Sequence, residues 1–189
     1  MKGKTSQKNC DYENVELFKI FQQGNNFDIL KSFLDIHGGI NATDEYGRTV
    51  LINCVIDYNN PIKKIVFANE YAKQLVNLGI DINKKDINGK VALHFCLSTK
   101  NYEILDFLLE LPNINIDVQP NLLGVADITN SSLIIKLIKS GLNPYEKNDV
   151  GYSFYDVLKE YDEGIRTKGS GKVNVKPIMD FISECTPFK

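Results

Sequence analysis

The stretch Gly89-Lys90-Val91-Ala92-Leu93-His94-Phe95-Cys96 decides the fold, because the pattern around it recurs along the chain. It begins three residues after Asp86. The same order of Asp or Asn, two variable residues, Gly, one variable residue and a small or β-branched residue occurs at residues 44–49 and 148–153. One such pattern is a weak signal, but three copies at related positions predict an internally repeated structure.

The spacing between the copies fixes the register of the repeat. Gly89 and Gly151 are 62 residues apart, and Gly79 and Gly141, which lie ahead of them, keep the same separation. The first interval, from Gly47 to Gly89, is 42 residues. Two different kinds of position rarely keep one spacing by chance, so the pattern indicates a true repeat.

The stretch at residues 89–96 resembles the ankyrin repeat pattern G-x-T-P-L-H-x-A, whose period is about 33 residues. The resemblance continues through residues 101–109, which are similar to the second helix of that family, and covers roughly residues 14–161. It implies an all-α fold, an ankyrin-repeat solenoid of about five stacked helix-turn-helix units. The Thr-Pro of the family is absent here, where Thr49-Val50, Val91-Ala92 and Ser153-Phe154 stand instead.

The intervals also predict two irregular units. The interval of 42 residues is about nine residues longer than one period, and the insertion falls around residues 57–64, between the two helices of its unit. Pro61 cannot lie inside a helix, so it suits the start of the second helix. The interval of 62 residues is about four residues shorter than two periods. The unit near residues 120–124 is therefore expected to have a degenerate hairpin.

Apolar residues at helical spacing predict the helix pairs themselves. The expected first helices span residues 15–21, 49–56, 91–97, 122–129 and 153–161, and the expected second helices span residues 27–34, 65–78, 103–111 and 133–140. Ser131-Ser132 is expected to cap the last of these. A loop at about residues 163–176 then leads to a C-terminal capping helix at about residues 177–185, with Pro177 in its first turn.

Length and composition favour one folded domain. The 189 residues are 43% hydrophobic and 24% charged, which is ordinary for a globular protein. We expect a flexible N-terminal tail at residues 1–12 and a single ankyrin-repeat domain at residues 13–189. The net charge of −2 disfavours nucleic acid as a partner, and no apolar run reaches the roughly 18 residues of a membrane helix. Without a secretory signal the chain is predicted to be cytoplasmic, with its four cysteines reduced.

No catalytic or metal-binding constellation is complete in the sequence. His94 takes the place of the family's His, where the resemblance implies a bond to the neighbouring turn backbone. Cys96 lies two residues from His94, and positions i and i+2 of a helix do not face each other. The segment Gly169-Ser170-Gly171-Lys172 lacks the first glycine of a Walker A loop, because Arg166 stands there. We therefore predict no enzyme activity, no cofactor, no metal and no small-molecule substrate.

The resemblance implies a protein-binding surface made by the hairpin tips and the adjoining ends of the first helices. Tyr and Arg anchor interfaces more often than other residues do, so Tyr46, Arg48 and Tyr152 are the main candidates. The full predicted partner-binding set is Glu45, Tyr46, Arg48, Ile56, Asp57, Ile87, Asn88, Lys90, Ser98, Thr99, Asp149, Val150, Tyr152 and Glu160. The alternative for each of them is an ordinary solvated surface residue.

The predicted function is a non-enzymatic protein–protein interaction module that presents a preformed surface. Residues 44–53 and 79–83 look like segments of small bacterial ankyrin proteins, some of which are immunity proteins that bind and occlude a toxin domain. A cognate toxin is therefore one predicted partner. The alternative is an effector or viral ankyrin protein that binds a host protein. A third class, an enzyme, would be revived by turnover that disappears when His94 or Cys96 is replaced.

Overall fold

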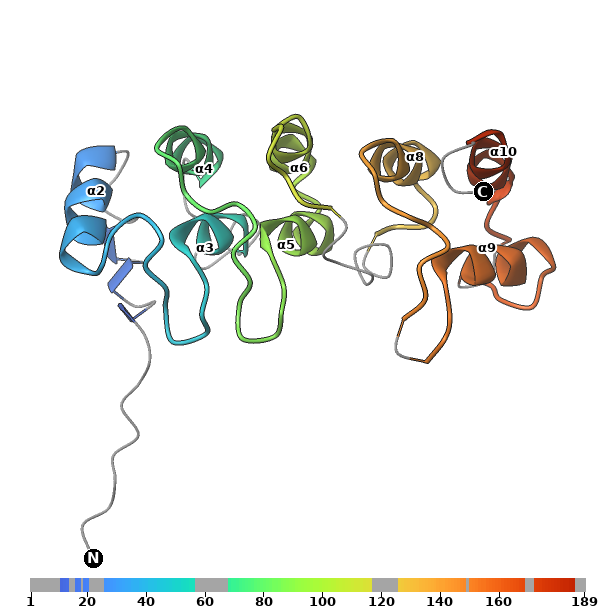
Figure 1. Ribbon diagram of the computed structural model, residues 1–189, viewed down its shortest axis with the longest axis horizontal. Coiled ribbons are helices and arrows are strands. Elements are labelled where there is room, and N and C mark those ends of the chain that lie inside the picture. The colour runs from blue at the N-terminus through green and yellow to red at the C-terminus, as the bar shows by residue number, and fades with distance from the viewer. Residues whose placement is uncertain are drawn as a thin grey trace, which may run out of the picture. The chain divides into compact units, whose positions relative to one another are not determined.

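The computed structural model of the chain describes residues 11–13, 16–17, 19–20, 26–56, 68–116, 126–148, 150–168 and 172–185. Across these residues the regular structure consists of helices and isolated β-bridges at the base of hairpins. The prediction of an all-α fold is thereby confirmed (Figure 1). The chain divides into two compact units, residues 1–110 (unit 1) and residues 111–189 (unit 2).

The helices of unit 1 form two rows after the first of them, α2 (Phe27–Ile36). One row holds α3 (Val50–Ile56) and α5 (Ala92–Thr99), and the other holds α4 (Ala68–Asn77) and α6 (Tyr102–Leu109) (Figure 1). Helix α3 packs on α4 and α5, and helix α6 packs on α5 and α4. Each helix therefore contacts the other helix of its own pair and the equivalent helix of the next pair, as stacked repeats require.

The two rows differ because their sequences differ in polarity. Helix α3 is apolar on almost every side, and its residues from Val50 to Val55 are all buried, as expected of a short helix enclosed on all faces. Helix α4 is amphipathic instead. It buries Tyr71 and Leu75, while Glu70 on its other side is exposed. The first helices thus form the interior of unit 1, and the second helices cover it.

A chain of polar contacts fixes the second helices of unit 1 to each other. Asn101 Nδ2 donates to Asn69 Oδ1 at 2.9 Å, and Asn69 Nδ2 donates to Glu103 Oε2 at 2.5 Å. Lys73 Nζ donates to Glu103 Oε1 at 2.6 Å. These bonds from Lys73 and Asn69 lower the pKa of Glu103 below its usual value. Because Asn69 and Asn101 are buried, a shift of α6 along α4 would leave buried amides unpaired.

Unit 2 contains α8 (Ser131–Lys139), α9 (Phe154–Asp162) and α10 (Lys176–Glu184). The last of these packs on both α8 and α9 and buries Ile178 and Ile182. Its first turn carries a proline, at a position that needs no N–H donor. This helix begins one residue before the start predicted for the C-terminal capping helix.

Helix N-termini show where the sequence interpretation was wrong in detail. Asn130, and not Ser131 or Ser132, caps α8, because its side chain accepts the N–H of Leu133 at 3.1 Å. The second helices α2 and α6 begin in the same way, with Asn26 and Asn101 as caps. Asn and Ser are both strong caps, and sequence alone does not choose between adjacent candidates.

Several predicted features lie outside the described residues. They are the insertion at 57–64, the degenerate hairpin at 120–124 and residues 122–125 of the first helix expected at 122–129. Residues 126–129 were predicted to complete that helix, but they form a bend and a turn before α8, so this part of the prediction is wrong. The Asn130 N–H closes the turn by donating to the Asp127 carbonyl at 2.9 Å. The division into a tail and a single domain stays a prediction.

The end of the predicted tail packs on the first hairpin. The N–H groups of Asp11 and Tyr12 donate to the carbonyl of Thr43, at 2.8 and 3.3 Å. The Tyr12 hydroxyl donates to the Arg48 carbonyl at 3.1 Å, and the Tyr12 side chain is buried. Burial raises the pKa of this phenol. Backbone and side-chain hydrogen bonds therefore hold residues 11 and 12 to this hairpin.

Candidate functional site

The Asp/Asn-x-x-Gly pattern builds three hairpin tips: hairpin 1 (residues 43–49), hairpin 2 (residues 85–91) and hairpin 3 (residues 147–153). In each, the Asp or Asn side chain accepts the backbone N–H groups two and four residues later. The distances are 2.8 and 2.9 Å for Asp44, 2.8 and 2.8 Å for Asp86, and 3.1 and 3.0 Å for Asn148. The glycine has a φ of 70°, 74° and 80° in the three copies, a region that favours glycine. The tips are therefore held by their own side chains.

Hairpins 1 and 2 pack directly against each other in unit 1. The N–H of Ile87 donates to the carbonyl of Tyr46 at 3.0 Å. A Cβ atom added to Gly47 would lie 3.1 Å from Ile87 Cγ2 and 3.2 Å from Ile87 N. Gly47 is thus required both for its positive φ and for the close approach of the next hairpin.

Arg48 lies where these two hairpins meet the first helix α5. Its guanidinium carbon is 4.7 Å from the centroid of the Tyr46 ring and 5.6 Å from that of Phe95. Its Nε is 3.9 Å from Asp86 Oδ2, and neither of these two buried atoms has a hydrogen-bond partner. The cation is therefore held by two rings and a buried carboxylate at ion-pair distance, without a direct bond between them.

Several predicted site residues of unit 1 lie on these two adjacent hairpins. Exposed apolar side chains stand at both tips, since Tyr46 is 44% exposed and Ile87 is 69% exposed. Asn88 and Lys90 are exposed beside them. We call the surface formed by Tyr46, Arg48, Ile87, Asn88 and Lys90 the hairpin face.

Other predicted residues of unit 1 are less prominent. Glu45 is exposed at the first tip, and Ile56 is half-buried at the end of α3. Ser98 is exposed and Thr99 is half-buried, and both hydroxyls donate to the Phe95 carbonyl, at 3.1 and 2.7 Å. Asp57 lies outside the described residues.

In unit 2 the predicted residues form a separate cluster. Tyr152 donates its hydroxyl proton to Glu160 Oε1, and Arg166 Nε lies 2.9 Å from Glu160 Oε2. Val150 at the tip of hairpin 3 is 84% exposed, and Asp149 lies outside the described residues. Tyr152 and Glu160 are therefore bound to each other, which occupies their polar atoms.

Residues 17–120 match the family model for ankyrin repeats, in three copies. The chain belongs to the ankyrin repeat family. This match confirms the assignment made from residues 89–96 and extends from the predicted first helix to the start of the unit that is predicted to have a degenerate hairpin.

Relatives of this ankyrin chain occur in viruses and bacteria. An I-Kappa-B like protein C1 of Microplitis demolitor bracovirus is 32% identical over 114 residues, which is 58% of this chain and 62% of the relative. An ankyrin repeat protein of fowlpox virus is 29% identical over 125 residues, 52% of this chain and 30% of the relative. An ankyrin repeat protein of Rickettsia bellii is 38% identical over 60 residues, 32% of this chain and 58% of the relative. The chain thus spans less than two thirds of the length of each.

The structure places His94 in the role that the family pattern implies. His94 Nδ1 accepts the N–H of Val91 at 3.2 Å, across the start of α5. Burial lowers the pKa of His94, and burial raises the pKa of the Cys96 thiol. A buried thiol of raised pKa is a poor nucleophile. Both side chains therefore serve the ankyrin fold.

Two residues near the hairpin face were not predicted from the sequence. Phe95 supplies the second ring against Arg48, and nothing in the sequence distinguishes it from the apolar residues around it. Asn53 donates from Nδ2 to Asp44 Oδ2 at 3.0 Å and to the Tyr12 hydroxyl at 3.3 Å. Its position inside an otherwise apolar helix was a readable signal, because a buried amide needs partners.

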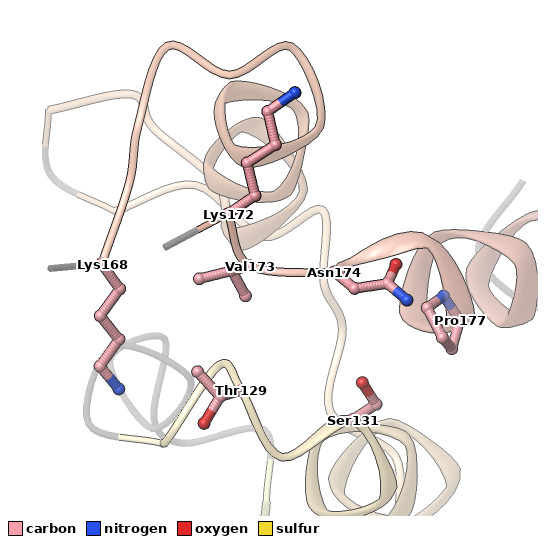
Figure 2. A pocket seen from close by; sticks show the side chains of 7 residues that line it. All are labelled: Thr129, Ser131, Lys168, Lys172, Val173, Asn174 and Pro177. Atoms are coloured by element: carbon pink, nitrogen blue, oxygen red, sulfur yellow. The ribbon is translucent and has the colours of Figure 1, made fainter. Parts of the chain in front are cut away.

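A cavity of about 400 Å³ lies in unit 2. It is lined by Lys168, Lys172, Thr129 and Ser131, so an anion site is one interpretation. However, Lys168 Nζ and Thr129 Oγ1 both donate to Asp127 Oδ1, at 2.6 and 2.8 Å. Figure 2 shows the amino group of Lys172 directed away from Thr129 and Ser131. The polar groups therefore do not converge on one ligand position.

The described parts of the chain hold neither a cluster of metal ligands nor a membrane-spanning helix. No group of three His, Cys, Asp or Glu side chains there is placed to hold a metal ion. No described helix is long and apolar enough to cross a bilayer.

Proposed function

We propose that the chain is a non-enzymatic module that binds another protein through the hairpin face of unit 1. Ankyrin repeats are protein-interaction modules, and this family membership supplies the coarse function. The observation that carries the proposal is the pair of exposed apolar side chains, Tyr46 and Ile87, on turns that are held by buried carboxylates.

The rigidity of the hairpin face supports this proposal. Asp44 and Asp86 fix the backbone of the two tips, and the Ile87–Tyr46 hydrogen bond fixes the tips to each other. A partner would therefore meet a surface that loses little freedom on binding, which lowers the entropic cost of association. Tyr46 and Arg48 also belong to the residue types that most often dominate binding energy.

The test compares two exposed isoleucines of unit 1. Ile87 on the hairpin face is 69% exposed, and Ile36 at the end of α2 is 80% exposed. Partners of the full chain are captured by cross-linking in its native cells and identified by mass spectrometry, and the affinity of each is then measured with purified protein. Ile87→Ser should weaken binding at least about tenfold, whereas the matched control Ile36→Ser should leave binding unchanged. Equal effects of the two variants would remove the assignment.

The identity of the partner is a finer proposal with two alternatives. An immunity role proposes a bacterial toxin domain that the module occludes without turnover. An effector or viral role proposes a host protein, and the relatives from a bracovirus and from fowlpox virus support it. Co-expression that protects cells from a toxin encoded next to this chain supports the first alternative. A host protein captured in an Ile87-dependent manner supports the second.

A further inference from the structure

The loops of unit 1 that form its hairpins carry more accessible positive than negative charge. Residues 41–49 and 80–91 contain four carboxylates and four basic side chains. Two of the carboxylates, Asp44 and Asp86, are buried beneath the turns, where they accept backbone N–H groups. Glu45 and Asp81 are the exposed acids of these loops, and Lys84, Lys85 and Lys90 are exposed bases. The solvent-facing charged groups of these loops are therefore predominantly basic, with three exposed lysines against two exposed acids.

The opposite side of unit 1 carries the reverse charge. Helices α2, α4 and α6 and the residue after α6 contain six exposed acids and two lysines among their described residues. One of those lysines, Lys73, is bound to Glu103 at 2.6 Å. The chain as a whole has a net charge of only −2, so this is a separation of charge between two sides. Such a separation orients an approaching partner by its charge.

The arginine at the centre of the hairpin face is placed to bind a carboxylate. Its Nε is 3.9 Å from Asp86 Oδ2, with no hydrogen bond between them. The rings of Tyr46 and Phe95 lie against its guanidinium group. The Nε atom is buried, but the Arg48 side chain is 23% exposed. A guanidinium group can bind a planar carboxylate in bidentate fashion.

An apolar side chain of the partner has a position beside this cation. Ile87 is exposed on the tip of hairpin 2 and is bonded through its N–H to Tyr46. Tyr46 therefore contacts Ile87 through its backbone carbonyl and Arg48 through its half-exposed ring. A nucleic acid would leave Ile87 without an apolar contact and would be repelled by Glu45, so the surface suits a protein segment better.

We propose that the hairpin face of unit 1 binds an acidic protein segment in which an Asp or Glu lies next to an apolar residue. The carboxylate binds Arg48, the apolar side chain covers Ile87 and Tyr46, and Lys90 attracts further negative charge. This inference rests on the proposed function, because it names the chemistry of the partner at the same site.

The first experiment selects ligands from a library of random 12-residue peptides displayed on phage, with the full chain immobilised. Enriched peptides should carry Asp or Glu beside Leu, Ile or Phe, and their affinity should fall as salt rises. Lys90→Glu should weaken binding of these peptides about tenfold and Lys90→Gln should weaken it less. Lys31→Glu, which makes the same charge change on exposed α2, is the matched control and should have no effect.

The outcomes separate this inference from the proposed function. Enrichment of basic or uncharged peptides, no enrichment at all, or equal effects of Lys90→Glu and Lys31→Glu would overturn the inference. A duplex DNA that displaces the selected peptides more strongly than an acidic competitor peptide would also overturn it. If a native partner depends on Ile87 but binds Lys90→Glu with wild-type affinity at all salt concentrations, docking at the hairpin face stands and the acidic partner does not. If Ile87→Ser has no effect either, both proposals fail.

Discussion

Two glycine substitutions test whether the stacking of neighbouring hairpins is as close as the structure has it. Gly47 and Gly89 occupy the same position of hairpins 1 and 2, with φ of 70° and 74°. Their surroundings differ, because a Cβ on Gly47 would lie 3.2 Å from Ile87 N, whereas a Cβ on Gly89 would have no atom within 4 Å. Gly89→Ala is therefore a matched control for Gly47→Ala.

The expected losses in the free energy of unfolding follow from these contacts. Both variants place alanine in the left-handed region, which costs about 1–2 kcal/mol, and the reduced freedom of the unfolded chain offsets roughly 0.5 kcal/mol of this. Gly89→Ala should therefore lower the free energy of unfolding by about 1 kcal/mol. In Gly47→Ala the Ile87 N atom cannot move away without lengthening its 3.0 Å bond to the Tyr46 carbonyl. Overpacking of this kind adds about 1–3 kcal/mol.

The assay is urea unfolding of the full chain, followed by far-ultraviolet circular dichroism. Gly47→Ala should lower the free energy of unfolding by at least about 1 kcal/mol more than Gly89→Ala. In an Ile87→Ala background the difference should shrink, because Cγ2 is removed, but it should not vanish, because the backbone N atom remains. Equal destabilisation by the two glycine variants would refute the direct packing of hairpin 1 on hairpin 2.

Three further predictions concern ionisable groups. Asp86→Asn keeps a side-chain acceptor for the turn, as Asn148 does in hairpin 3, and should lower the free energy of unfolding in urea by about 1 kcal/mol. Asp86→Ala removes the acceptor and should lower it by about 2–3 kcal/mol. Equal losses in the two variants would contradict a role for the side-chain acceptor. Burial lowers the pKa of His94 from 6.5, so the folded state resists protonation of this side chain. The contribution of neutral His94 to the free energy of unfolding should be fully present above pH 6.5 and should be lost as the pH drops below that value. His94→Gln should weaken this dependence when unfolding is measured at pH 7 and pH 5. Hydrogen bonds from Lys168 and Thr129 lower the pKa of Asp127 to about 2. Carboxyl NMR titration should show this pKa rise toward the usual range in Lys168→Met. The stability that ionised Asp127 adds above its unfolded pKa should be lost as the pH falls toward 2. An unchanged Asp127 pKa in that variant would show that Lys168 is not its partner in solution.

The hairpins were predictable from sequence because each one is closed by its own residues. The Asp or Asn side chain, the two N–H groups that it binds and the glycine with positive φ all lie within five consecutive residues. The same reasoning placed His94, whose partner is the N–H of Val91. Local hydrogen bonds leave a readable pattern, and their spacing identified the repeat.

Helix ends and the members of the site were harder to predict from the sequence. Asn130 caps α8 although the neighbouring serines fit the same rule. Tyr152 was expected to be a leading anchor, but it is bound to Glu160 within unit 2. Phe95 was not expected at all, although it lies against Arg48. Each of these depends on which side chains meet in three dimensions.

The sequence by itself determined the family, the helix pairs and the three turns, because these depend on apolar periodicity and on bonds between near neighbours. Only the tertiary structure decided that Arg48 contacts the Phe95 ring of the next repeat, that Asp86 lies buried beside it, and that Ile87 remains exposed. Those three facts arise from the stacking of one repeat on the next. Stacking brings together residues from different repeats, and a pattern read within one repeat carries no information about such contacts.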